Sequence, residues 1–311
     1  MAEKSVSRLV ATAFCVNAGL LVGLAAVYYF THSQLVLAQG SDSLLDLVAG
    51  GVLWVTARVS MQPQDEDHPF GHHRAEPIGA LITAVFAGVL AFEVGQSAIW
   101  SLLAESRPSL NSTVWLMLGG KASAKLIFFG VLLRSSQNSR SPALHATRID
   151  TRNDILAALS SLIGAGLYSA GWQQADSLLA IPVAIYIGGS GFQLARENIR
   201  YLMGEAPDEK TLEELRSLAT RPAGVVQVRR VRAHHVGAVL HVEVTVLIDE
   251  HATATESHDI GVAVQHEVEA HTLVAQAFIH VDTHTGRPHE PQGGRPHEPQ
   301  GGESHEPQPD P

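Results

Sequence analysis

Two pairs of aspartates lie inside stretches of sequence that are otherwise apolar enough to cross a lipid bilayer. Asp42 and Asp46 form one pair, and Asp150 and Asp154 form the other, each with a spacing of four residues. A carboxylate at bilayer depth costs roughly 2.5 to 3.5 kcal/mol on insertion scales, so it is retained where it binds an ion or a charged partner. The fold must therefore keep both pairs away from lipid.

The spacing of each pair predicts that its two carboxylates share one helix face, because residues four apart in a helix lie one above the other. Two such helices packed together would bring four carboxylates to one point. Hard or borderline divalent cations such as manganese prefer this oxygen ligand set over nitrogen or sulfur ligands. For a single aspartate, helix capping or a salt bridge is the alternative interpretation.

Six apolar stretches predict six membrane helices, each near the roughly 20 residues needed to span hydrocarbon. They cover residues 9–30, 35–60, 78–103, 112–133, 143–170 and 176–200. The first is expected to be a retained helix and not a cleaved signal, because no clear small-residue cleavage site precedes the second. We therefore expect residues 1–203 to form a six-helix transmembrane transport domain.

Basic residues gather on one set of loops and helix ends, while the alternate loops carry only Arg107. The basic set comprises Lys4, Arg8, Arg58, Arg74, Arg134, Arg140, Arg196, Arg200 and Lys210. By the positive-inside rule both termini are cytoplasmic. At about 1.5 Å per residue both aspartate pairs then lie roughly 10 to 17 Å deep. This is near the midplane, where alternating-access transporters hold their substrates.

Other charged residues lie within the predicted spans. Lys121 and Lys125 form a pair four residues apart in the fourth span, and Glu93 lies in the third. Buried ion pairing is one interpretation, and the other is that a lysine supplies a counter-charge to the empty carboxylate site. Arg152, two positions from each aspartate of its pair, should point away from that site.

The loop at residues 64–76 is dense in groups that can bind metal. Asp65, His68 and His72 are the best candidates for a second cation site at the cytoplasmic mouth. A solvated acidic and histidine-rich loop is the alternative, and it would raise the local cation concentration without forming a defined site.

Residues 204–283 have the pattern of a small soluble unit, with elements in the order αββαβ. The expected elements are a helix near 208–220, strands at 225–232 and 239–248, a helix near 255–271 and a strand near 274–282. This order predicts a cytoplasmic α+β ferredoxin-like domain with one open sheet face. Its candidate metal ligands are His241, His258, His280 and Asp282, with a solvated surface role as the alternative.

The remaining sequence features narrow the function. Residues 284–311 carry an eight-residue repeat rich in His, Pro and Gly, at 287–294 and 295–302, and are expected to be a disordered tail. Cys15 is the single cysteine, which excludes an intramolecular disulfide and a thiolate metal cluster. The net charge of −10 says little about nucleic acid, but the sequence has no basic stripe with interleaved aromatic residues, so nucleic-acid binding is not expected.

Three motifs together resemble the cation diffusion facilitator family over residues 1 to about 283. They are Ser41-Asp42-Ser43-Leu44-Leu45-Asp46-Leu47, the loop His68-Pro69-Phe70-Gly71-His72-His73-Arg74-Ala75-Glu76, and the Asp150 to Asp154 pair. The resemblance implies six membrane helices, a cytoplasmic ferredoxin-like domain and a homodimer. It also implies metal export from the cytoplasm against proton entry.

Within this family the sequence is similar to the manganese branch. Zinc transporters of the family typically have a histidine in the intramembrane site, whereas this chain has Asp150 there. The ending Phe278-Ile279-His280-Val281-Asp282 is also similar to manganese-handling members. Two positions depart from the family pattern: Arg229 replaces a strand histidine, and Gly204 replaces an aspartate, leaving Glu205 as a possible partner for Arg74 at the dimer interface.

We therefore expect a secondary transporter, and not an enzyme, that exchanges divalent cations for protons around Asp42, Asp46, Asp150 and Asp154. Manganese is the expected cargo, with iron(II) or zinc as alternatives, and no resident cofactor is expected. The expected location is the cell (inner) membrane, as a multi-pass homodimer in contact with the lipid bilayer. The alternative from another class is a membrane-anchored metal sensor.

Overall fold

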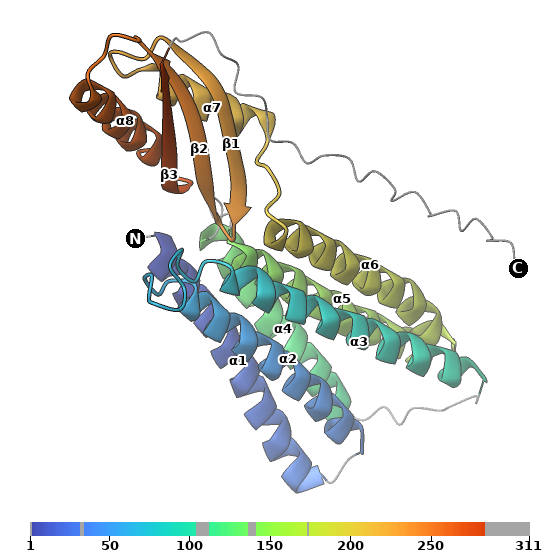
Figure 1. The fold of residues 1–311 in the computed structure, drawn as a ribbon. Helices are drawn as coiled ribbons and strands as arrows, with labels where there is room; N and C mark the ends of the chain where they lie inside the picture. Colours follow the sequence, from blue (N-terminus) through green and yellow to red (C-terminus); the bar gives the residue numbers. More distant parts are fainter. Residues whose placement is uncertain (1, 32–33, 104–111, 136–140, 173, 284–311) are drawn as a thin grey trace, which may run out of the picture.

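Six long helices make up the N-terminal part of the chain (Figure 1). The computed structural model describes residues 2–31, 34–103, 112–135, 141–172 and 174–283. The helices are α1 (Ala2–Thr31), α2 (Gln34–Val59), α3 (Ala75–Leu103), α4 (Ser112–Ser135), α5 (Pro142–Ser169) and α6 (Ala175–Leu202). Each covers one of the six apolar stretches found in the sequence. The expected disordered tail at 284–311 lies outside the described residues.

Four of these helices are long and apolar enough, by length and composition, to cross a membrane. The candidate spans are Val6–Phe30, Ala75–Leu103, Trp115–Arg134 and Ala175–Leu202, which belong to α1, α3, α4 and α6. The prediction of six spans is therefore supported by composition for four helices. The other two, α2 and α5, carry the aspartate pairs together with Arg58, Arg148 and Arg152. Large apolar side chains such as Phe192, which is 74% exposed, cover the outside of the bundle, as expected for contact with lipid.

The core of the bundle receives buried side chains from all six helices. Val10, Leu53, Leu132, Leu144 and Leu194 are each no more than 1% exposed, and Ala84 of α3 completes the set. Small residues allow the helices to approach closely, as is typical of membrane bundles. This packing fixes the rotation of each helix and therefore the direction in which its polar residues point.

A buried carboxylate joins the ends of three helices near the α2–α3 loop. Glu76, 8% exposed at the start of α3, accepts hydrogen bonds from Ser60 Oγ at 3.2 Å and from Ser141 Oγ at 2.6 Å. Ser141 also caps α5, since its Oγ accepts a hydrogen bond from the Leu144 N–H at 3.3 Å. These contacts set the start of α5, eight residues before Asp150.

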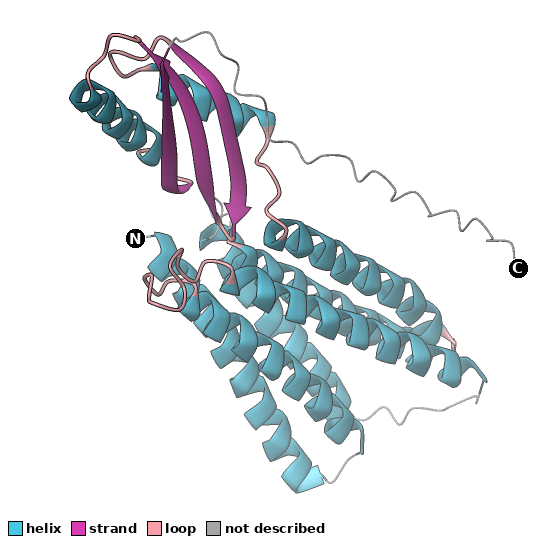
Figure 2. Cartoon of the chain, viewed as in Figure 1, coloured by secondary structure: helices cyan, strands magenta, loops and turns pink. Residues whose placement is uncertain are grey.

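The C-terminal part folds into a small α+β unit, which confirms the predicted αββαβ order (Figure 2). Its elements are α7 (Glu209–Thr220), β1 (Gln227–Val236), β2 (Val239–Ile248), α8 (Ala254–Glu269) and β3 (Val274–Thr283). The strand order is β1-β2-β3, with β1 antiparallel and β3 parallel to the central β2. Residues Leu215 of α7 and Val264 and Val268 of α8 pack with Val242 and Val244 in one core. Both helices therefore cover the same sheet face.

The α2–α3 loop lies against the open face and the hairpin turn of this sheet. The Phe70 and His241 rings are 5.8 Å apart, and a Cβ at Gly237 would overlap the carbonyl oxygen of His73. Gly237 also has φ +67°, a region that favours glycine. The start of α1, the α2–α3 loop and the α+β domain thus lie at the same end of the bundle (Figure 1).

Candidate metal site

The two aspartate pairs lie on helices that contact each other within the bundle. Asp42 and Asp46 of α2 and Asp150 of α5 line one small cavity, together with Asn153 and apolar residues of α2 and α3. Each pair occupies one helix face, as the spacing of four residues requires. Asp154 lies one turn further along α5, with its side chain 3% exposed.

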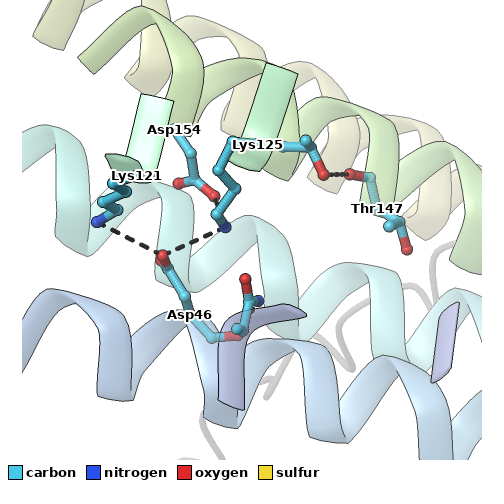
Figure 3. A network of polar contacts seen from close by, with 7 residues as sticks. Asp46, Lys121, Lys125, Thr147 and Asp154 are labelled. Atoms are coloured by element: carbon cyan, nitrogen blue, oxygen red, sulfur yellow. Dashed lines mark hydrogen bonds and ion pairs between the residues drawn. The ribbon is translucent and has the colours of Figure 1, made fainter. Parts of the chain in front are cut away.

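Two lysines of α4 form ion pairs with one aspartate of α2 and one of α5 (Figure 3). The Lys125 ammonium is 2% exposed, forms a close ion pair with Asp154 Oδ2, and lies 3.5 Å from Asp46 Oδ2. Lys121, one helical turn earlier, places its Nζ 3.8 Å from the same Asp46 oxygen. The two lysines therefore pair with Asp46 and Asp154, one aspartate from each pair.

The four aspartates do not form a closed group of ligands in this arrangement. Across the described part of the chain, three ligand atoms come within 4.8 Å of one another only at Asp65, His68 and His72. The Lys125 ammonium instead joins Asp154 to Asp46. Four carboxylates on two adjoining helices would supply oxygen ligands to a divalent cation if small side-chain movements brought their oxygens around one point.

Two neighbours of the second pair fix the orientation of α5. Asn153 Nδ2 donates to Ser190 Oγ of α6 at 3.0 Å, and both side chains are buried. The Arg152 guanidinium lies 5.2 Å from the centre of the Tyr186 ring, so it faces α6, away from the aspartates, as its spacing predicted. Asn153 was missed by the sequence reasoning, although its position three residues after Asp150 was a usable signal.

The structure brings Asp65, His68 and His72 together in the α2–α3 loop. Asp65 Oδ1 lies 3.1 Å from His68 Nδ1, and Asp65 Oδ2 lies 3.3 Å from His72 Nε2. His72 Nδ1 lies 3.2 Å from the Pro63 carbonyl oxygen, and donation there would leave the Nε2 lone pair directed at Asp65. The backbone N–H of His68 is the main cause that lowers the pKa of Asp65. One carboxylate and two imidazoles are thus arranged as potential ligands.

The structure does not bring His241, His258, His280 and Asp282 together. His241 is 6% exposed and packs against Phe70, and burial lowers its pKa. His258 lies on α8, which covers the opposite sheet face. His280 and Asp282 do share one strand face, with His280 Nε2 3.0 Å from Asp282 Oδ1. These four candidate ligands therefore do not share one site within the described chain, and a metal-binding role for any of them stays a prediction.

Arg229, and Glu205 next to Gly204, have ion-pair partners within the chain. Arg229 Nη1 lies 3.3 Å from Asp282 Oδ2, so a guanidinium holds the carboxylate that a metal would need. Glu205, which follows Gly204, pairs with Arg200 within the chain, and its expected contact with Arg74 at the dimer interface stays a prediction. Both contacts are ion pairs in places where the sequence suggested a metal site or a dimer contact.

Comparison with known families and proteins agrees with this architecture. Residues 10–203 match the cation efflux transmembrane domain, and residues 207–284 match the cytoplasmic domain of cation efflux proteins. An uncharacterized transporter of Methanocaldococcus jannaschii is 29% identical over 85% of the chain and 94% of its own length. The manganese efflux system protein MneS of Bacillus subtilis is 26% identical over 86% and 95%. The cation-efflux pump FieF of Klebsiella pneumoniae is 25% identical over 93% and 96%.

Proposed function

Because the chain belongs to the cation efflux family, we propose that it exports manganese(II) from the cytoplasm in exchange for protons. Asp42, Asp46, Asp150 and Asp154 hold the ion in transit. The observation that carries this proposal is the convergence of acidic side chains from α2 and α5 inside a helical bundle. Carboxylates at such a depth serve ion binding far more often than they serve stability.

The choice of manganese rests on ligand chemistry. The four side chains offer oxygen atoms alone, with no imidazole or thiolate among them, and such sets suit manganese or magnesium better than zinc. MneS, a relative over most of the chain, is described as a manganese efflux protein. Iron(II) and zinc are the competing cargoes that the transport assay must include.

Proton exchange follows from crowding the carboxylates in a site of low dielectric. Neighbouring carboxylates resist being ionised together, so protons held by the empty site would leave as a divalent cation enters. The proton gradient would then drive the metal outward. A membrane-anchored sensor has no need of acidic side chains this deep in the bundle, so export is the better account.

The topology we propose has six spans, α1 to α6, and both termini in the cytoplasm. The concentration of basic residues on one set of loops supports this orientation. The match of residues 207–284 to the family's cytoplasmic domain supports assembly as a homodimer. Asp65, His68 and His72 would form a second cation site at the cytoplasmic mouth.

Transport into proteoliposomes tests the proposal. Purified protein is reconstituted, a proton gradient is imposed, and uptake of manganese, iron(II) and zinc is measured for the wild type and Asp154→Asn. Asp176→Asn is the matched control, because Asp176 is a half-buried aspartate of α6 outside the site. We expect gradient-driven manganese uptake that is lost in Asp154→Asn and kept in Asp176→Asn. Uptake that survives in Asp154→Asn would contradict the role of the site.

A further inference from the structure

The ammonium of Lys125 occupies the region between the two aspartate pairs. Its Nζ contacts Asp154 Oδ2 of α5 and lies 3.5 Å from Asp46 Oδ2 of α2, so a single cation joins the two metal-binding helices (Figure 3). The side chain is 2% exposed and is the largest of the fully buried side chains. A lysine this deeply buried is retained where its charge is needed.

A metal ion bound by both pairs would compete with this ammonium. Oxygen ligands contact divalent cations at roughly 2.0 to 2.6 Å, so an ion bridging Asp46 and Asp154 would fill the space next to the same oxygens. Two cations cannot occupy that space together without strong repulsion. The four-carbon stem of lysine is flexible, so the ammonium can move while its backbone stays fixed.

We infer that Lys125 is a built-in counter-cation that fills the aspartate site between cargo ions and must withdraw when the metal binds. This inference rests on the proposed export function. In this scheme α4 takes part in the transport cycle. Lys125 competes with the cargo for the aspartate oxygens and thereby limits how tightly the cargo is held.

The charges of the site fit a divalent cargo. Once the protons have left, four ionised carboxylates and the two ammonium groups of Lys121 and Lys125 leave two negative charges, which one divalent cation neutralises. The lysines also lower the charge that the empty site must carry through the bilayer between transport steps. Without Lys125 the empty site is more negative, so it should bind the metal more tightly. The empty transporter should also return more slowly to the state that faces the cytoplasm.

The test separates binding from turnover. Manganese affinity is measured by titration calorimetry on the purified protein in detergent at one fixed pH, and transport rate at saturating manganese is measured in proteoliposomes. We expect Lys125→Met to bind roughly tenfold or more tightly, or about 1.4 kcal/mol, while its transport rate falls several-fold. A lysine that only holds the helices together would give unchanged or weaker binding, and that result would overturn the inference.

Two control variants keep the test decisive if Lys125→Met fails to fold. Lys125→Arg keeps the positive charge and should keep an affinity near that of the wild type. Lys121→Met removes the more distant ammonium, which lies 3.8 Å from Asp46 Oδ2, and should tighten binding by a smaller factor. Unchanged or weaker binding in Lys121→Met would count against the inference even without data on Lys125→Met.

The same experiment also tests the proposed function separately from the role of Lys125. If the wild type binds no divalent cation, or if Asp154→Asn binds as well as the wild type, the aspartate site itself is wrong. If Asp154→Asn abolishes binding at the aspartate site, leaving only binding at the loop site, but neither lysine variant tightens it, the export function stands and the counter-cation is rejected.

Discussion

Substitutions of Lys125 and Asp154, which form a buried ion pair, should have non-additive effects on the stability of the protein. At 3.5 Å from Asp46 Oδ2, the Lys125 ammonium gains about 5 kcal/mol of Coulomb energy at an effective dielectric constant of about 20, before desolvation. Removing one member of a buried pair costs about 3 to 5 kcal/mol, because the other charge stays buried. We expect the lower value for Asp154→Asn, since Asp46 still pairs with Lys125.

The measurement is a double-mutant cycle on metal-free protein. The Tm of each variant is determined by thermal unfolding in detergent at a fixed scan rate. A loss of 3 kcal/mol corresponds to a fall in Tm of roughly 6 to 12 °C for a domain of this size. Lys125→Met and Asp154→Asn should each show such a fall, while the double variant should fall no further than the worse single variant. Additive losses in the double variant would refute the ion pair as the source of the effect.

Three further predictions concern other parts of the chain. Gly79→Ala should destabilise the bundle by about 1 to 3 kcal/mol in thermal unfolding, because the new Cβ would overlap the Thr56 side chain, whereas Gly88→Ala meets nothing within 4 Å and should be tolerated. Thr253→Ala removes the capping box of α8 and should cost about 1 kcal/mol, measured by hydrogen exchange of that helix. Burial lowers the pKa of His241 in the folded protein below its value of 6.5 in the unfolded chain. The stability that the neutral imidazole contributes is therefore fully present above pH 6.5 and is lost as the pH falls through the folded-state pKa. His241→Gln should flatten this dependence in pH-stepped unfolding, and a wild-type-like slope would contradict the burial argument.

The positions of the helices and strands could be predicted from the sequence because each has its own hydrophobic pattern. The six apolar stretches gave six helices, and the alternation in Val239–Ile248 gave β2 over the same residues. The number of membrane spans was harder to predict, because only four of the six described helices are apolar enough to qualify by composition. The aspartates and arginines that make α2 and α5 informative are also the residues that make them too polar to pass as spans on their own.

The partners of the charged residues depended on three-dimensional packing. The spacing of Lys121 and Lys125 showed that they share a face, but the rotation of α4 toward Asp46 and Asp154 is set by contacts between helices. In the α+β domain, nothing in the sequence distinguished His241, His258 and His280 from one another as metal ligands. The placement of α8 on the covered sheet face separates His258 from His241.

The loop site was the candidate for which local sequence was sufficient. Asp65, His68 and His72 lie within eight residues, and the turn at His68 brings their ligand atoms together. The aspartate site instead joins residues more than one hundred positions apart in the chain. Its geometry therefore depends on the packing of α2 against α5, which sequence spacing alone does not specify.

The most direct test of the account is the location of manganese in the loaded protein. Crystals grown with manganese should give an anomalous scattering peak between α2 and α5, within bonding distance of carboxylate oxygens from both aspartate pairs. A second, weaker peak at Asp65, His68 and His72 would be compatible with the account. A peak at the loop alone, with Asp42, Asp46, Asp150 and Asp154 free of metal at saturating manganese, would contradict the central claim.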